Sequence, residues 1–290
     1  MIDGCELDPG RHSLLQARGI TLNPARLYPA AVSRILSQGL LALAFLLLPV
    51  AARATTYTWS TTPAFPAGPT SGNTVTAIYG GLGAVSITNV GGGVWTSGYP
   101  VVESNGGTNG DPTGGLTNTP GLELYVASQS SVSNYMKVTI SFGYKGGATN
   151  VSFNLWDVDA STNFTDKISN IVGVTASGAL VPLTVTGSTD NTVTGSGTVN
   201  ATATGNAAAS NNTSAGNVTI SSGTTPIQSI TFQYYDSNAT TRTTQIIGIS
   251  PITFTPIGSA TPEVGSALGC LLLCGGVAGA GAWRRRGNKA

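Results

Sequence analysis

The sequence predicts an all-β fold, an antiparallel β-sandwich or jelly roll, flanked by an N-terminal signal peptide and a C-terminal transmembrane helix. Three observations support this fold class. Apolar and polar residues alternate in short runs, Gly, Asn and Ser separate these runs, and no amphipathic helix stands out. A strand with alternating residues has one buried and one solvent-facing side, and many short strands separated by turns are typical of antiparallel sandwiches.

The composition favours a packed β domain over a disordered chain. Only 9% of the 290 residues are charged and 39 are Gly, but 40% are apolar and the aromatic residues fall in alternating runs. Low charge and high Gly content also occur in disordered chains, whereas regular apolar alternation indicates a buried core. A chain of this length allows one or two domains, and we expect a single sandwich at 55–258.

Three runs show the alternation most clearly. Their apolar faces consist of Met136, Val138, Ile140, Phe142 and Tyr144, of Val151, Phe153 and Leu155, and of Ile230, Phe232 and Tyr234. In the third run, Tyr235 is expected on the opposite face. Shorter strands are expected at 122–126, 171–174, 183–185, 218–220 and 246–254.

Two segments are too polar to be predicted as half-buried strands. Residues 105–119 are almost all Gly, Asn, Thr and Pro, which predicts a long surface loop. Residues 188–216 are dominated by Thr, Asn, Ala and Gly, and two alternatives stay open there: polar edge strands or a mobile segment.

Charged residues are distributed unevenly between the body and the termini. Between Thr55 and Ala260, four basic residues stand against eight acidic ones, a net charge of −4, and nine of the thirteen basic residues lie in the termini. Binding to phosphate groups needs clusters of Lys or Arg. We therefore expect no nucleic-acid partner.

The body also lacks the residues that most catalytic and zinc sites require. The only Cys residues are Cys5, Cys270 and Cys274, and the only His is His12. This excludes from the body a disulfide framework, nucleophilic catalysis by Ser-His-Asp or Cys-His, and the usual zinc sites. We predict no catalytic residues and no enzyme activity.

The N-terminal region predicts export. Residues 1–33 are expected to be an unstructured leader, and a start codon assigned too far upstream would explain its length. Residues 34–54 have the layout of a signal peptide: Arg34 supplies positive charge, 35–48 are apolar, and Ala52 and Ala54 form a small-x-small cleavage site. The alternative, an uncleaved membrane helix, requires a longer apolar run than this one.

The sharpest internal feature is a group of aspartates after one predicted strand. If the strand from Val151 keeps its register, Asp157 and Asp159 continue its buried face, and Asp166 follows shortly after. Buried carboxylates need a partner, and oxygen ligands suit Ca²⁺, so these three residues are a candidate calcium site. The alternative is that the strand ends at Trp156 and both aspartates lie in a solvated turn.

Two carbohydrate-related functions remain open for the body. Glycosidases need only two carboxylates, and Glu103, Glu123, Asp157 and Asp159 are available. Glu123 lies between Leu122 and Leu124, however, as an outward strand residue would. Saccharide stacking is the second function, and its candidates are Trp95, Tyr99, Trp156, Tyr234 and Tyr235, although such residues are more often core positions.

The C-terminal residues 259–290 have the layout of a membrane-directed tail. Pro262 and Glu263 precede an apolar run at 264–283, and Arg284, Arg285 and Arg286 follow it. Twenty residues at helical rise span about 30 Å, the thickness of the hydrocarbon core. The arginines are expected to remain cytoplasmic, so the body would face outward.

This order of motif, apolar span and arginine cluster resembles the PEP-CTERM sorting signal of exosortase substrates in Gram-negative bacteria. The matching residues are Pro262, Glu263, the span 264–283 and Arg284 to Arg286, and Val264 stands where the family has Pro. The resemblance implies cleavage near the motif by an exosortase-type membrane protease and release to the cell surface. The family is associated with biofilms and exopolysaccharide. A permanent single-span anchor is the alternative.

Together these features predict an exported protein of the cell surface or extracellular matrix with a structural or adhesive role. The runner-up function is an exopolysaccharide-binding module, and a glycoside-active enzyme is third. The expected partners are the membrane, the processing protease and a polysaccharide, and calcium is the only cofactor considered.

Overall fold

The computed structural model describes residues 53–104, 111–127, 133–238 and 244–258 of the chain. Residues 1–52, with the predicted leader and most of the predicted signal peptide, and residues 259–290, with the predicted span 264–283, lie outside the described residues. Within the described residues, no helix is long and apolar enough to cross a membrane.

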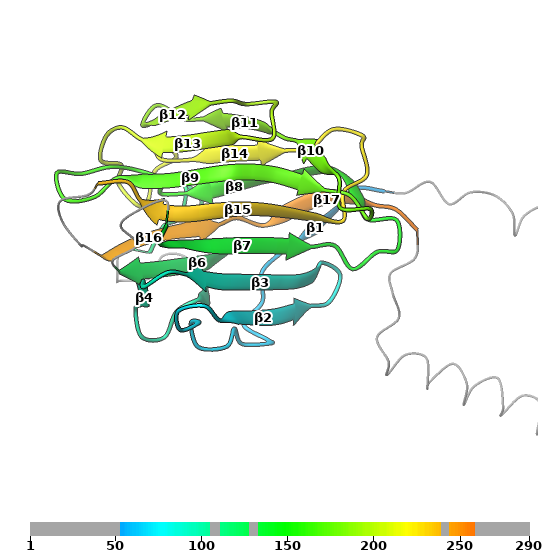
Figure 1. The fold of residues 1–290 in the computed structure, drawn as a ribbon, viewed down its shortest axis with the longest axis horizontal. Helices are drawn as coiled ribbons and strands as arrows, with labels where there is room; N and C mark the ends of the chain where they lie inside the picture. The colour runs from blue at the N-terminus through cyan, green and yellow to red at the C-terminus, as the bar shows by residue number, and fades with distance from the viewer. Residues whose placement is uncertain (1–52, 105–110, 128–132, 239–243, 259–290) are drawn as a thin grey trace, which may run out of the picture. The chain divides into compact units, whose positions relative to one another are not determined.

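The described residues form seventeen strands arranged in two sheets (Figure 1). The nine-stranded sheet contains β1 (Thr55–Tyr57), β4 (Val94–Trp95), β5 (Val101–Ser104), β6 (Pro120–Ala127), β8 (Ala148–Trp156), β11 (Thr184–Gly187), β14 (Val218–Ser221), β16 (Thr244–Ile249) and β17 (Ile252–Pro256). The eight-stranded sheet contains β2 (Thr74–Tyr79), β3 (Gly83–Val90), β7 (Tyr135–Ser141), β9 (Asp166–Val174), β10 (Leu180–Pro182), β12 (Asn191–Thr194), β13 (Ala201–Gly205) and β15 (Ser229–Asp236).

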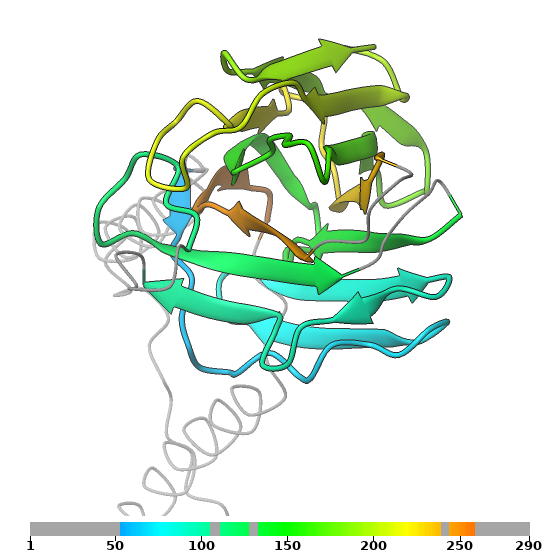
Figure 2. The ribbon, with the colours of Figure 1, turned by 90° about the vertical axis from the view of Figure 1, so that its left-hand side faces the viewer.

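Neighbouring strands are antiparallel throughout both sheets. The main path of the larger sheet runs β1-β17-β8-β16-β6-β4, and that of the smaller sheet runs β12-β13-β9-β15-β7-β3-β2. In Figure 1 the smaller sheet lies in front of the larger one, and Figure 2 shows the two layers from the side. The predicted all-β class is therefore confirmed, and the two sheets are consistent with a β-sandwich.

The core consists of the inward faces of both sheets. The predicted apolar faces are buried along the strands: residues 136, 138 and 140 on β7, residues 151, 153 and 155 on β8, and residues 230, 232 and 234 on β15 are each at most 3% exposed. The first face was expected to continue to Phe142 and Tyr144, but β7 ends at Ser141; Phe142 is buried beyond that end, and Tyr144 is only partly buried. They belong to one hydrophobic cluster with residues of β3, β6, β16 and β17. Burying this apolar surface is the main stabilising contribution to such a fold.

Several shorter predictions differ from the structure in detail. The expected strand at 246–254 is two strands, β16 and β17, because Ser250 and Pro251 interrupt it. Likewise, only 184 and 185 of the expected strand 183–185 lie in a strand, at the start of β11, whereas Leu183 lies in the break between β10 and β11. The polar segment 188–216 contains β12 and β13, which lie at one end of the smaller sheet, so the edge-strand alternative holds for those residues.

The hairpin of β2 and β3 has no counterpart among the predicted strands. Its wet face is a ladder of hydroxyl pairs, with 2.7 Å between the side-chain oxygens of Thr74 and Thr88 and 2.8 Å between those of Thr76 and Ser86. Cross-strand Thr pairs of this kind stabilise a sheet without charge.

Candidate functional site

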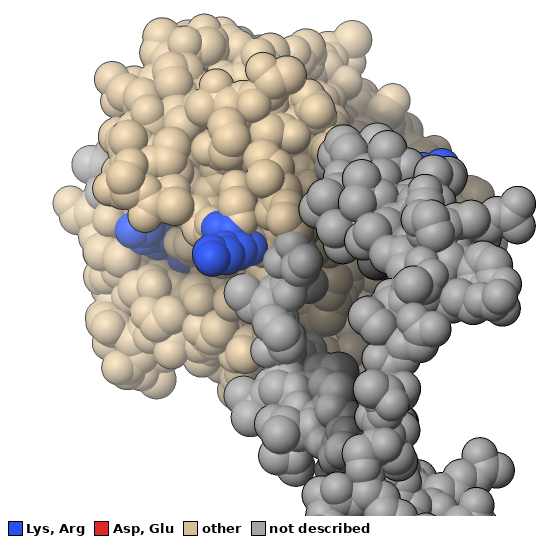
Figure 3. Space-filling model, turned by 90° about the vertical axis from the view of Figure 1, so that its right-hand side faces the viewer, with Lys and Arg blue, Asp and Glu red and all other residues tan. Residues whose placement is uncertain are grey.

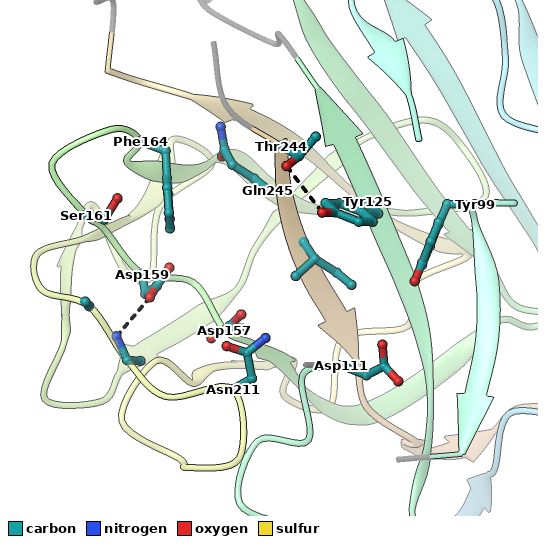
Figure 4. Close-up of a pocket in the computed structure, with 13 residues that line it drawn as sticks. Tyr99, Asp111, Tyr125, Asp157, Asp159, Ser161, Phe164, Asn211, Thr244 and Gln245 are labelled. Carbon is teal, nitrogen blue, oxygen red and sulfur yellow. Dashed lines mark hydrogen bonds between the residues drawn. The ribbon is translucent and has the colours of Figure 1, made fainter. Parts of the chain in front are cut away.

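The best candidate site is a pocket of about 460 Å³ between loops at one end of the strands (Figure 4). Its walls come from the β4–β5, β5–β6, β8–β9 and β13–β14 connections and from β6 and β16. Three acidic and three aromatic side chains line it: Asp111, Asp157, Asp159, Tyr99, Tyr125 and Phe164. No Lys or Arg among the described residues does so.

Asp157 follows directly after the last residue of β8. The strand ends at Trp156, and the backbone of Asp157 has a φ of 62°, a left-handed conformation that Asp adopts more readily than most residues. The turn does not expose the side chain to solvent, because only 8% of Asp157 is accessible. Its Oδ1 is fully buried and has no hydrogen-bond partner.

The structure thus combines the two alternatives that the sequence left open for these aspartates. The strand ends where the solvated-turn alternative placed its end, but Asp157 and Asp159 are buried, as the strand alternative required. The segment after β8 folds back through an antiparallel bridge between Ala160 and Thr165, and this places the aspartates under the β13–β14 connection.

Asp159 and Asp166 differ from Asp157 because each of them accepts hydrogen bonds from the protein. Asp159 Oδ2 accepts a hydrogen bond from the Ala209 N–H at 2.8 Å. Asp166 is 1% exposed and accepts hydrogen bonds from the Asp159 N–H at 3.3 Å and the Tyr234 hydroxyl at 3.1 Å. Asp166 therefore lies behind the pocket wall, where it fixes the loop, and does not line the pocket.

Burial raises the pKa values of these carboxyl groups. Desolvation, with a smaller contribution from the charge of Asp159, raises the pKa of Asp157 to about 7. Desolvation also raises the pKa of Asp159 to about 6, although the Ala209 N–H opposes this shift. The pKa of Asp166 is raised for the same reason, and each neighbouring charge that acts on these groups is another carboxylate. The site lacks a compensating positive charge in the described residues.

Glu123 is a second buried acid and corrects a prediction. It was expected to face solvent from its strand, but it is 1% exposed. It does lie on the side of β6 opposite the core, yet loops cover that side of the sheet. Desolvation, followed by the charges of Asp111 and Glu103, raises the pKa of Glu123 to about 9.

The loops that cover this outer face of the larger sheet pack around Trp156. Its side chain is fully buried but is not part of the central cluster between the sheets. A Cβ atom added at Gly114, Gly121 or Gly248 would lie 2.1–2.7 Å from its indole ring, so the ring packs directly on glycine backbone. The Asn217 side chain donates to the Gly114 carbonyl at 3.0 Å and ties this loop to the β13–β14 connection.

Most of the aromatic residues proposed for saccharide stacking are inaccessible. Trp156, Tyr234 and Tyr235 are at most 3% exposed, and Trp95 is half-buried against the core. Only Tyr99 of that set lines the pocket. Its ring meets that of Tyr125 edge-to-face, with 5.1 Å between centroids and an interplanar angle of 90°.

The predicted calcium site at Asp157, Asp159 and Asp166 stays a prediction. The structure brings the three residues close enough for their charges to interact: beyond the effect of burial, the charge of Asp159 raises the pKa of Asp157, and both charges raise the pKa of Asp166. Among the described residues, however, no group of three His, Cys, Asp or Glu side chains has an arrangement that could hold a metal ion. A cation there would need carbonyl, amide or water oxygens as well.

The predicted sorting motif and most of the predicted signal cleavage site lie outside the described residues. This applies to Pro262, Glu263, Val264 and Arg284 to Arg286, with Ala52, whereas Ala54 is an exposed residue just before β1.

No protein-family model, curated protein or solved structure matches this chain.

The sequence singled out only Tyr99, Asp157 and Asp159 among the residues that line the pocket, and it did not indicate Asp111, Tyr125, Phe164 or Asn211. One signal could have found Tyr125, because Leu122, Leu124 and Val126 face the core and therefore place Glu123 and Tyr125 together on the other side of β6. Asp111 and Asn211 lie in irregular connections that meet only through tertiary contacts, such as the 2.7 Å bond from the Thr113 N–H to the Asn211 carbonyl.

Proposed function

We propose that this chain is an exported β-sandwich or jelly-roll protein of the cell surface or extracellular matrix, with a structural or adhesive role. The observation that carries the proposal is the order Pro262-Glu263, apolar span and arginine cluster at the end of the chain. The Ala52-x-Ala54 pattern after an apolar run supports export through a cleaved signal peptide.

The surface of the described body supports a structural role. Outward strand positions bear hydroxyl and amide pairs in place of charges, such as Thr219 to Asn154 at 2.7 Å and Thr56 to Thr253 at 2.9 Å. Figure 3 shows a face on which a few basic side chains stand out and no acidic atom of the described residues is visible. A surface with little charge is insensitive to the ionic strength outside the cell.

Mass spectrometry of the mature protein from the native host tests the sorting proposal. A C-terminus near Thr261 in the surface or extracellular fraction is the expected result, and retention of Arg286 in the membrane fraction would contradict it. Glu263→Ala should keep the tail attached, whereas Val264→Pro, which restores the third residue of the family motif, should preserve processing.

Saccharide binding is the second candidate function, and the pocket favours it. A pocket of about 460 Å³ with aromatic walls and a few polar groups has the size and chemistry of small-molecule sites. Substitution of Tyr99 by Ala should abolish retention on a polysaccharide column, whereas Trp95→Ala, which leaves the pocket lining unchanged, should lower stability without selectively abolishing retention.

A further inference from the structure

The size of the pocket points to an organic ligand. About 460 Å³ is far more than one bare ion occupies, and it falls within the usual range for small-molecule sites. Asp157 and Asp159 approach it from the β8–β9 connection, and Asp111 approaches it from the β5–β6 connection (Figure 4). Carboxylates spread around a pocket suit a ligand with several polar groups.

The charged groups of the pocket indicate the sign of the ligand's charge. Three carboxyl groups line it, those of Asp111, Asp157 and Asp159, and the described residues place no Lys or Arg among the lining side chains. An anionic ligand would be repelled, and a neutral one would leave the burial cost of the carboxylates uncompensated.

One atom independently indicates a missing donor. Asp157 is 92% buried, since 8% of its surface is exposed, and its Oδ1 has no hydrogen-bond partner. The neighbouring Asp159 Oδ2 has the Ala209 N–H as donor at 2.8 Å. A buried carboxylate with one oxygen lacking a donor is costly, and a charged N–H group that reaches the part of Asp157 lining the pocket would offset that cost.

The aromatic side chains indicate the rest of the ligand. Tyr99 and Tyr125 form one wall with their edge-to-face pair, and Phe164 stands on the other side beside Asp159 (Figure 4). Such rings pack against the C–H faces of sugars and attract cations. The hydroxyl groups of Tyr125 and Thr244, joined at 3.2 Å, add polar atoms at the same wall.

We propose that this pocket binds an amino sugar as a cation, with its ammonium group donating to Asp157 and its ring lying between the aromatic side chains. The inference rests on the second candidate function, saccharide binding, and narrows its ligand class. It does not depend on how the chain is exported.

Binding of three probes to the purified full-length protein near neutral pH tests the proposal. Glucosamine is the charged probe, N-acetylglucosamine is its neutral counterpart, and calcium chloride reports a metal site. Isothermal titration calorimetry should show that glucosamine binds about tenfold or more tightly than N-acetylglucosamine, because only the former has the ammonium group.

Asp157→Asn is the decisive variant. Asn tolerates the left-handed backbone at this position and keeps the side-chain size, so the fold should be retained and the melting temperature should not fall. Glucosamine affinity should drop about tenfold or more. Asp190 lies outside the pocket lining and acts on Asp159 only at a distance, through its charge, so Asp190→Asn makes the same chemical change and should leave the affinity within about twofold of the wild type.

Each contrary outcome removes a defined part of the proposal. Equal affinity for the two sugars would overturn cation recognition and leave saccharide binding in place. No binding of either sugar would overturn both. A calcium response that Asp157→Asn abolishes, without glucosamine binding, would make the pocket a metal site and overturn the amino-sugar assignment.

Discussion

At the scale of single residues, Glu123 is the clearest case of a group whose environment changes its chemistry. It is 1% exposed, and its Oε2 lacks a hydrogen-bond partner. Burial, reinforced by Asp111 and Glu103, raises its pKa to about 9. At neutral pH the side chain is therefore protonated in the folded protein and ionised in the unfolded chain.

This difference sets the direction of a pH effect. Between pH values near 4.5 and 9, the folded state holds a proton that the unfolded state has lost, so the free energy of unfolding falls as the pH rises. One such proton gives a slope of at most about 1.4 kcal/mol per pH unit. Glu123→Gln removes the titrating group, and we expect a shallower pH dependence and higher stability at pH 8 in urea unfolding.

Glu103→Gln provides the matched control for this prediction. Glu103 lies on the neighbouring strand β5 and is only partly buried, so its loss removes one nearby negative charge but not the buried carboxyl. The pH dependence of the free energy of unfolding of Glu103→Gln should therefore stay close to that of the wild type. If Glu123→Gln and wild-type stability run parallel across this pH range, Glu123 is ionised in the folded protein.

At the scale of elements, the outer face of the larger sheet depends on glycines beneath Trp156. A Cβ at Gly121 of β6 would lie 2.4 Å from Cζ3 of the indole ring. The ring is enclosed on its other sides and cannot move away freely. Gly121→Ala should therefore lower the free energy of unfolding by about 1–3 kcal/mol, the usual cost of overpacking, as measured by denaturant titration.

Two further variants isolate the steric cause of this effect. Gly223→Ala introduces the same methyl group where nothing lies within 4 Å, so it should leave stability nearly unchanged. In a Trp156→Phe background, Gly121→Ala should cost less, because the smaller ring leaves room for the methyl group. Additive effects of the two substitutions would exclude contact with the ring as the cause.

The same cover explains where prediction from the sequence succeeded and failed at this scale. The core faces of β7, β8 and β15 were predictable, because period-2 alternation directly reports a strand with one buried side. Burial of Glu123 was not predictable, because the β5–β6 connection packs over the outer face of the sheet, and neither was burial of Tyr235, which was expected on the side opposite the core. No local pattern encodes such contacts.

The candidate site was predictable only in part for the same reason. Asp157 and Asp159 were found because they continue a strong strand, and their burial could be anticipated. Their neighbours in the pocket come from connections more than forty residues away in either direction, such as Asp111 and Asn211. The β2–β3 hairpin escaped notice because Thr, Ser and Ala occupy many of its positions and weaken the apolar signal.

At the scale of the whole molecule, acidic and basic residues of the body occupy different places. Six of its eight acidic residues are buried: Asp111, Asp157, Asp159, Asp166, Asp236 and Glu123. Of the three described lysines of the body, Lys137 and Lys145 are exposed and Lys167 is half-buried. The interior therefore contains most of the groups that titrate with pH, whereas the surface contains few charges for salt to screen.

This separation predicts that the free energy of unfolding depends weakly on salt concentration and strongly on pH. Raising sodium chloride from about 0.05 M to 0.5 M screens only surface charges, which contribute little here, so the free energy of unfolding should change by less than about 0.5 kcal/mol. Raising the pH from 5 to 8 should lower it by more than that, because Glu123 and Asp157 lose protons less readily in the folded state than in the unfolded chain. Urea unfolding at both salt concentrations and both pH values gives the comparison. A large salt effect combined with a flat pH profile would mean that water and ions reach these carboxylates, and the pocket would then be an open surface feature.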